Sequence, residues 1–298
     1  HCGRPATARA FTALGAVGGM NVLLTGAFGR VGTAVIDHLA DREAYEFTYL
    51  DREPHPDYDA HVADVSDFEA IRPAFDDQDA VVHLAGNPSP AASWGSVLEN
   101  NVVGTRNALE AAKEAGVESF VFASTNHVTG MYEIENRPGI YDPPTESPPE
   151  SQICIDHTDP VRPDSHYGVS KSFGEDLGRY YVECEDAPER FYALRICGVR
   201  HAADDHPYGD AERGVENGEF ERRSEAYERA VAVQKARWGS RRDLAALVDA
   251  ALQDETVTFD IFYGASDNRA RWVDIEHARA VLGHRPRDDA SEWDGPPE

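Results

Sequence analysis

Short apolar runs alternate with longer amphipathic stretches along most of the chain after residue 20. The apolar runs have the length of buried strands, and they span residues 21–25, 47–50, 61–63, 80–84, 119–123 and 191–196. Between the fourth and fifth runs, mostly apolar residues recur at helical spacing up to a glycine suited to end a helix, namely Leu98, Val102, Thr105, Leu109, Ala112 and Gly116. Strands that alternate with helices form βαβ units. The pattern therefore predicts an α/β protein with a doubly wound parallel sheet.

Two stretches interrupt this alternation. Residues 131–164 hold seven prolines, and so long a loop in a compact domain is typical of a functional lid. Residues 200–230 are polar and lack a strand pattern, which is consistent with a mobile insertion. The remaining pattern predicts a small C-terminal lobe with a helix, a strand and a helix at 242–252, 256–263 and 273–282. We expect a larger domain over 20–199 and this lobe over 200–298.

Residues 1–19 differ from the rest of the chain, because they contain no acidic residue and are rich in Ala and Gly. Met20 is the expected start of the folded part, so we interpret 1–19 as an extension outside the fold. No apolar run approaches the roughly 18 residues that a membrane span needs. The sequence therefore predicts a soluble protein without a membrane partner.

Acidic residues outnumber basic residues by 54 to 28, which gives a formal net charge of −26. Such a surface repels a polyanion and excludes nucleic acid as a natural partner. Only three basic residues are lysines, namely Lys113, Lys171 and Lys235. An acidic surface almost without lysine is typical of proteins adapted to concentrated salt, where the Debye length falls to about 3 Å at 1 M. We predict a halophilic protein of a salt-rich cytoplasm; an acidic mesophilic enzyme would explain the charge but not the scarcity of lysine.

Three glycines follow the first predicted strand in the segment Thr25–Gly32, where a helix is expected to begin. Glycines at such a turn let the backbone approach a pyrophosphate, whose charge rests on free N–H groups of the helix N-terminus. The order of strand, turn and helix favours a dinucleotide site over a glycine-rich turn without function. Asp51 ends the second strand, where its carboxylate favours NAD over NADP, although Arg52 weakens this preference. Asp64-Val65 follows the third strand and either contacts adenine or forms a simple turn.

Tyr167 and Lys171 are four residues apart at the start of a predicted helix, so their side chains share one face, one turn apart. A nearby ammonium stabilises phenolate and lowers a tyrosine pKa from about 10, which lets the tyrosine act as a general base near neutral pH. By itself this spacing is common. Its position after the glycine-rich turn, and the scarcity of lysine, favour a catalytic pair.

Four motifs occur in a characteristic order, T-G-A-x-G-x-x-G at 25–32, H-L-A-G at 83–86, N-V-V-G-T at 101–105 and Y-G-V-S-K at 167–171. With them, about residues 20–290 resemble the extended short-chain dehydrogenase/reductase superfamily. The resemblance implies a Rossmann-type NAD-binding domain over 20–199 and a small substrate-binding lobe over 200–298. The cofactor contacts it implies are Gly26, Phe28, Gly29, Arg30, Val31, Asp51, Arg52, Asp64, Val65, Leu84, Ala85, Gly86, Asn101, Tyr167, Lys171 and Ile196.

The same resemblance implies catalytic roles for four residues. Tyr167 is the base, and Lys171 also holds the nicotinamide ribose. Asn101 supports a proton relay. Thr125, at the end of the fifth strand, aligns with the hydroxyl residue that holds the substrate oxygen, and the neighbouring Ser124 is a second candidate for this role.

Two further stretches, S-T-N-H-V-T-G at 124–130 and F-Y-G-A-S-D-N at 262–268, are similar to the uronate dehydrogenases and the haloarchaeal NAD-dependent glucose-6-phosphate dehydrogenases. In that branch an Asn-His pair contacts sugar hydroxyls or the anionic group of the substrate, which implies this role for Asn126 and His127; for His127 a structural role is the alternative. The implied substrate contacts are Ser89, Thr125, Asn126, His127, Tyr167 and Gly198. A cationic cluster could also clamp a carboxylate or phosphate, or instead form a helix face paired with Glu225 and Glu228, and its members are Arg229, Lys235 and Arg237.

These residues predict an NAD-dependent sugar dehydrogenase that oxidises the C1 hydroxyl of an aldose, uronic acid or sugar phosphate to a lactone. A nucleotide-sugar epimerase or dehydratase that retains its NAD is the alternative, although Asn126-His127 stands where 4,6-dehydratases carry Asp-Glu. The intact Thr125, Tyr167 and Lys171 set disfavours a non-catalytic NAD sensor. The cysteines show no C-x-x-C pair and no metal-ligand spacing with histidine, so no metal site is predicted. The sequence leaves open which sugar is used and whether the chain forms a homo-oligomer.

Overall fold

The computed structural model describes residues 19–137, 139–141 and 153–297. Its centre is a seven-stranded parallel sheet with the strand order β3-β2-β1-β4-β5-β6-β7. The strands are β1 (Met20–Thr25), β2 (Tyr45–Asp51), β3 (His61–Val62), β4 (Ala80–His83), β5 (Ser119–Thr125), β6 (Arg190–Ile196) and β7 (Phe259–Gly264). The predicted doubly wound α/β fold is therefore confirmed.

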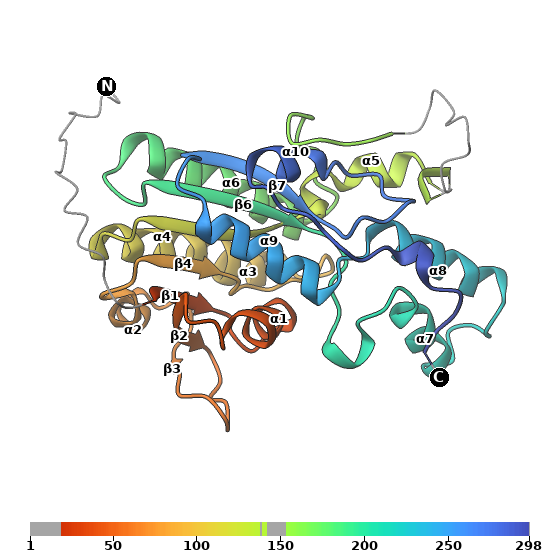
Figure 1. The fold of residues 1–298 in the computed structure, drawn as a ribbon, viewed down its shortest axis with the longest axis horizontal. Coiled ribbons are helices and arrows are strands. Elements are labelled where there is room, and N and C mark those ends of the chain that lie inside the picture. The colour runs from red at the N-terminus through yellow and green to blue at the C-terminus, as the bar shows by residue number, and fades with distance from the viewer. Residues whose placement is uncertain (1–18, 138, 142–152, 298) are drawn as a thin grey trace.

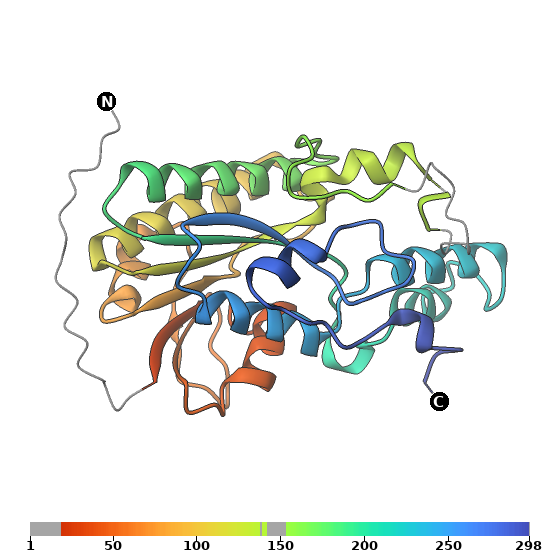
Figure 2. The ribbon, with the colours of Figure 1, turned by 45° about the horizontal axis from the view of Figure 1, so that its top comes forward.

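Helices cover both faces of the sheet (Figure 2). In β1, Val22 and Leu24 face one layer and Leu23 faces the other, because successive side chains of a strand alternate. The first layer contains α1 (Arg30–Leu39) and α9 (Arg241–Gln253). The second contains α2 (Phe68–Ile71), α4 (Gly104–Ala115) and α6 (His166–Cys184). Burial on both faces explains why the central strands read as continuous apolar runs.

The strand predicted in the C-terminal lobe lies in the main sheet. It is β7, and it pairs with β6 from Phe191↔Phe259 to Ile196↔Gly264. The helix predicted at 242–252 is α9, which packs against α1. α10 (Glu276–Val281) packs against β7. Part of the segment 200–298 therefore belongs to the central seven-stranded sheet.

Residues 200–230 contain regular structure that the sequence pattern did not predict. α7 (Gly209–Glu216) and α8 (Glu225–Arg237) lie together beyond one end of the sheet (Figure 1). A separate apolar cluster joins them, and it consists of Tyr208, Ala211, Tyr227 and Val231 with Val215, Phe220, Ala230 and Trp293 around them. These apolar residues come from several segments, so no single segment of the sequence shows apolar residues at a clear helical spacing.

Shorter elements complete the description. α3 (Trp94–Val97) continues into the π-helical segment η2 (Leu98–Val103), and α5 (Gly130–Glu135) precedes the short 3₁₀ turn η4 (Gly139–Tyr141). The predicted lid at 131–164 includes residues 138 and 142–152, which lie outside the described residues, as does nearly all of the extension at 1–19. Among the described residues, no helix combines the length and apolar character needed to cross a membrane.

Candidate active site

A cavity of about 950 Å³ opens at the carboxyl ends of the central strands. This is where doubly wound sheets bind ligands, because the strand order reverses there between β1 and β4. Most of the predicted site residues line it, namely Gly26, Phe28, Gly29, Arg30, Val31, Asp51, Arg52, Asp64, Val65, Leu84, Ala85, Gly86, Thr125, Asn126, His127, Tyr167, Lys171, Ile196 and Gly198. Two predicted residues, Ser89 and Asn101, are not part of its lining.

The glycine-rich turn between β1 and α1 has a shape that only glycine permits at two positions. Gly26 has a φ of +67°, a left-handed conformation that other residues rarely adopt. At Gly32, a Cβ atom would lie 2.2 Å from the carbonyl oxygen of Ala27. The turn therefore brings the start of α1 close to the preceding strand and exposes backbone N–H groups to the cavity. This arrangement fits the pyrophosphate of a dinucleotide.

Asp51 lies at the carboxyl end of β2, directly opposite the glycine-rich turn. Its Oδ2 atom accepts a hydrogen bond from the backbone N–H of Phe28 at 3.0 Å, and its Oδ1 atom accepts one from the N–H of Arg52 at 2.8 Å. The carboxylate thus has a fixed position on the cavity wall. At Asp64, hydrogen bonds from the backbone and hydroxyl of Ser66 lower the carboxyl pKa, so this residue forms a local turn, which was the alternative to an adenine contact.

Tyr167 and Lys171 come from the first two turns of α6, whose N-cap is Ser165. Burial raises the pKa of Tyr167 to about 12, while its hydrogen bond with Thr125 lowers the pKa in part. Burial also lowers the pKa of Lys171 to about 8. Its ammonium lies 4.8 Å from the ring centre of Phe122. Desolvation therefore dominates the pKa of Tyr167, and Lys171 is not among the groups that shift it.

The two neighbouring hydroxyls at the end of β5 differ in what they contact. Ser124 donates a 2.5 Å hydrogen bond to Glu175, and Glu175 forms a buried ion pair with Arg195 at 2.9 Å. Thr125 instead bonds Tyr167 and accepts a hydrogen bond from the backbone of His127. Glu175 therefore holds the Ser124 hydroxyl, whereas the Thr125 hydroxyl lies beside Tyr167 at the cavity.

Asn101 lies behind the cavity wall, in the π-helical segment η2. Its amide oxygen accepts from the backbone N–H of Asn87 at 2.7 Å, and its amide nitrogen donates to the carbonyl of Asn87 and to the hydroxyl of Ser170. Asn101 therefore fixes the loop after β4 against α6. Ser89 follows in this loop, where its backbone N–H donates to the side chain of Asn87. It is Asn87 that lines the cavity.

Asn126 and His127 follow β5 directly, and both residues line the cavity. The amide nitrogen of Asn126 is buried and has no partner among the described residues. The Nδ1 atom of His127 lies 2.7 Å from a carboxylate oxygen of Asp164, and the imidazole ring packs edge-on near Tyr167. A buried amide nitrogen without a protein partner is unusual.

Of the three candidate cations ahead of Trp238, only Arg237 reaches the cavity. Arg229 pairs with Glu225 on the exposed side of α8, and Lys235 donates to the carbonyl of Trp293. Within residues 19–137, 139–141 and 153–297, Arg237 makes no ion pair, and its Nε atom is buried without a hydrogen-bond partner. The N–H of Gly198 donates to its carbonyl at 2.7 Å, which fixes this residue beside the end of β6.

Sequence reasoning missed several cavity residues after β4 and β6. These include Asn87, Ser96, Asn100, Arg200 and His201. Arg200 and His201 follow β6, and ligands bind where parallel strands end, so their position in the sequence was a usable signal. Asn87, Ser96 and Asn100 lie in a loop and a short helix without such a marker. Arg30 donates to His201 at 3.1 Å and so links the glycine-rich turn to the β6 loop.

Comparisons with known proteins agree with this geometry. The model of the NAD dependent epimerase/dehydratase family matches residues 22–258, and the chain belongs to this family. It is 39% identical to the NAD-dependent glucose-6-phosphate dehydrogenase of Haloferax volcanii, over 91% of this chain and 95% of that protein. It is 36% identical to the L-arabinose 1-dehydrogenase (NAD(P)+) of the same organism, over 91% and 97%. The crystal structure of glucuronic acid dehydrogenase from Chromohalobacter salexigens superposes with a TM-score of 0.69 and 29% identity, over 92% and 86%.

Proposed function

We propose that the protein is an NAD-dependent sugar dehydrogenase that oxidises the C1 hydroxyl of an aldose, uronic acid or sugar phosphate to a lactone. The observation that carries this proposal is the shared cavity, in which Thr125, Tyr167 and Lys171 lie beside the glycine-rich turn. The two Haloferax volcanii relatives are an NAD-dependent glucose-6-phosphate dehydrogenase and an L-arabinose 1-dehydrogenase (NAD(P)+), which supports the same reaction class.

The residues around the β1–α1 turn fit NAD. Backbone N–H groups at the start of α1 would hold the pyrophosphate, and Asp51 would accept hydrogen bonds from the adenosine ribose. The Asp51 carboxylate would also repel a 2′-phosphate, which favours NAD over NADP. Bound NAD supplies the carbon that accepts the hydride.

Tyr167 removes the proton of the C1 hydroxyl in this proposal. The hydroxyl of Thr125 lies within hydrogen-bond reach of Tyr167 and holds the sugar oxygen between them. The pKa of Tyr167 is about 12 and has to fall for this role. In this proposal the positive charge of Lys171, one turn away, lowers it when the sugar and NAD are bound. The hydroxyl oxygen loses the proton and C1 loses the hydride to NAD, so C1 becomes a carbonyl carbon next to the ring oxygen. The product is a lactone.

The other end of the cavity favours a sugar that carries an anionic group. Arg237 is a cation without an ionic partner among the described residues, in a chain with a net charge of −26. Arg200 lies near it and adds positive charge, although Arg200 is paired with Asp210. A guanidinium binds a carboxylate or phosphate through paired hydrogen bonds. Asn126 and His127 would contact the sugar hydroxyls.

A substrate panel tests this function directly. Purified protein in about 2 M KCl is given NAD and uronates, pentoses, hexoses or hexose phosphates, and NADH absorbance is followed. We expect net NADH with at least one free sugar, faster with anionic sugars, and a lactone as the first product by NMR. Interconversion of nucleotide sugars without net NADH would instead establish the epimerase alternative.

We further propose that the enzyme works in a salt-rich cytoplasm. A net charge of −26 creates strong self-repulsion in dilute buffer, and salt screens it. The melting temperature should rise steeply between about 0.1 M and about 2 M KCl. An unchanged melting temperature over this range would contradict the halophilic assignment.

A further inference from the structure

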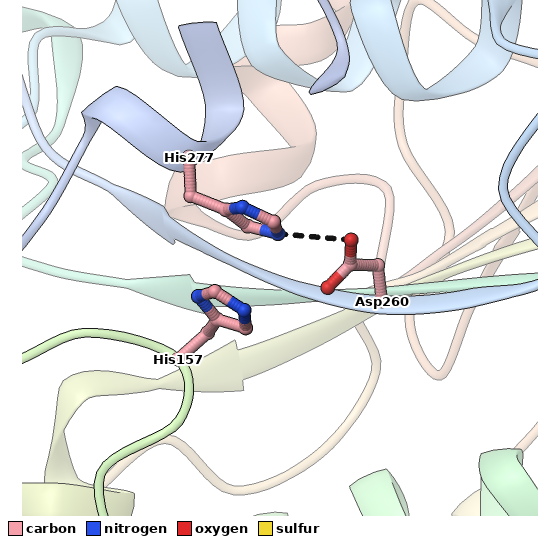
Figure 3. A group of neighbouring side chains, drawn as sticks. All are labelled: His157, Asp260 and His277. Atoms are coloured by element: carbon pink, nitrogen blue, oxygen red, sulfur yellow. Dashed lines mark hydrogen bonds and ion pairs between the residues drawn. The ribbon is translucent and has the colours of Figure 1, made fainter. Parts of the chain in front are cut away.

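Three possible metal ligands gather on the edge strand of the sheet, outside the lining of the cavity. Figure 3 shows His157, Asp260 and His277 close together, and one potential ligand atom of each lies within 4.8 Å of the others. Asp260 belongs to β7, His277 belongs to α10, and His157 lies two residues after Ile155, which forms a β-bridge with Val273. The Nε2 atom of His277 lies 2.9 Å from Oδ2 of Asp260.

Backbone hydrogen bonds fix the two histidine segments beside each other. The N–H of Ile155 donates to the carbonyl of Trp272 at 2.8 Å, and the N–H of Asp274 donates to the carbonyl of Ile155 at 2.9 Å. The side chain of Asp274 then accepts from the backbone N–H of His277 at the start of α10. The three donors are therefore held together by the fold itself, as a binding site requires.

Ring packing accounts for only part of this arrangement. The imidazoles of His157 and His277 stack with centroids 3.7 Å apart, and His277 also stacks on Phe262. The Nδ1 atom of His157, however, is buried and has no hydrogen-bond partner among the described residues. Buried polar atoms are nearly always paired, so this nitrogen indicates a partner that the protein alone does not supply.

The charges around the cluster favour a cation. The charged groups that act on the neighbouring thiol of Cys154 are Asp156, Asp159 and Asp274 against a single base, Arg271. Arg271 is itself paired with Asp267 at 2.7 Å. The local field is therefore negative, and Asp260 adds a further carboxylate at the centre.

We propose that His157, Asp260 and His277 bind a divalent zinc-like ion, with water as the remaining ligand. Two imidazole nitrogens and one carboxylate oxygen suit Zn²⁺ and the neighbouring transition metals rather than Mg²⁺. The ion takes the place of the hydrogen between His277 Nε2 and Asp260 Oδ2, and the neutral imidazole then carries its single proton on Nδ1. The ring of His157 turns out of the stack so that one nitrogen faces the ion. Binding joins residues 153–159 and α10 to β7 and leaves the catalytic cavity unchanged.

Cobalt is the probe that tests this site in the untagged, full-length protein. After treatment with EDTA, Co²⁺ is titrated in about 2 M KCl, which competes with non-specific carboxylate binding. We expect saturable one-to-one binding with visible d–d absorption, displacement by Zn²⁺, and no competition from Mg²⁺. Zn²⁺ should raise the melting temperature.

Variants distinguish the cluster from the acidic surface. His157→Gln and His277→Gln should each weaken Co²⁺ binding at least about tenfold, whereas His38→Gln, at an exposed position on α1, should bind like the wild type. Dehydrogenase activity should be unchanged in all three. Absence of saturable binding to the wild type would overturn the proposal even if a variant failed to fold. Equal affinity in the wild type and both cluster variants would also overturn it.

Discussion

The two halves of the cavity are built in different ways. The nucleotide half comes from one continuous strand–turn–helix unit, β1 to α1, and from the ends of the adjacent strands β2 and β4. The substrate half is assembled from separate segments, which contribute Asn87, Asn126, Gly198 and Arg237. Only the first half has the local signature of a motif, because its shape depends on residues that are neighbours in the sequence.

The halves also differ in how their polar groups are satisfied. In the nucleotide half, Asp51 already accepts two backbone hydrogen bonds, which fix its carboxylate before any ligand binds. In the substrate half, the amide nitrogen of Asn126 and the Nε atom of Arg237 are buried without partners in the described part of the chain. Buried polar groups of this kind discriminate strongly between ligands. A ligand that cannot hydrogen-bond to them leaves them unpaired in the complex, which costs binding free energy. We therefore expect cofactor binding to be robust and substrate choice to depend on single residues.

The largest effect should come from Tyr167, which lies where the two halves meet. Tyr167→Phe removes the proposed base but keeps the buried ring, so kcat should fall by about 10²- to 10⁴-fold while NAD binding, measured by calorimetry, stays nearly unchanged. A variant that keeps more than about a tenth of wild-type kcat, when chemistry limits turnover, would refute the assigned role.

Arg237 tests whether the substrate half selects an anion. Arg237→Met keeps much of the side-chain volume and removes the charge-assisted hydrogen bonds, so kcat/KM for a uronate or hexose phosphate should fall by about 10- to 100-fold. The value for a neutral sugar should change little. Arg229→Met is the matched control, because Arg229 lies on the exposed side of the same helix and pairs with Glu225. Equal losses for charged and neutral sugars would show that Arg237 is only structural.

Asp51 tests the nucleotide half, where we expect a smaller change. Asp51→Ala removes a fixed acceptor and the repulsion of a 2′-phosphate, so the preference for NAD over NADP should narrow by roughly tenfold. Sugar selectivity should be unchanged, since Asp51 lies at the other end of the cavity. Asp57→Ala, at an exposed position of the following loop, is the control. Faster wild-type turnover with NADP at equal concentration would contradict the NAD assignment.

The same contrast explains what could be predicted from the sequence. All strands in 20–199 were expected. Burial on both faces of a parallel sheet explains the continuous apolar runs of the central strands, although the edge strand β3 is exposed. The turn at Gly26 and the Tyr167–Lys171 pair were found through fixed local spacing. By contrast, α7 was missed, since its buried Ala211 contacts Tyr227 and other residues that are distant in sequence. The meeting of His157 with His277 also depends on tertiary contacts, which no local spacing encodes.

The place of β7 in the sheet could not be predicted from the sequence either. Its apolar residues predicted a strand, but not its neighbour, because the sequence does not show which edge of the sheet is free. Pairing with β6 buries Phe262 between layers and extends the sheet by one strand. The expectation that Lys171 lowers the pKa of Tyr167 likewise rested on spacing alone. It did not include the burial of both groups, which dominates in the cofactor-free protein.

The smallest expected effect concerns stability at the junction of the two halves. Burial lowers the pKa of Lys171 to about 8 in the folded protein, against an ordinary value of 10.5. Below pH 8 both states bind the proton, and the folded state carries the full desolvation cost of the charge. Between pH 8 and 10.5 the unfolded chain binds more protons, so this group makes stability rise with pH.

Lys171→Met should therefore raise the melting temperature of the cofactor-free protein by a few degrees at pH 7, and this gain should shrink as the pH rises toward 10. The pH range of this test ends at 10 because burial also raises the pKa of Tyr167, to about 12. Above pH 10 that shift makes stability fall as the pH rises. Lys113→Met is the control, since ion pairing with Glu185 raises the pKa of Lys113. Its loss should not stabilise the fold. A gain in melting temperature for Lys171→Met that stays constant from pH 6 to pH 10 would arise from apolar packing and not from removal of a buried charge. Such a result would show that burying the Lys171 charge does not destabilise the fold.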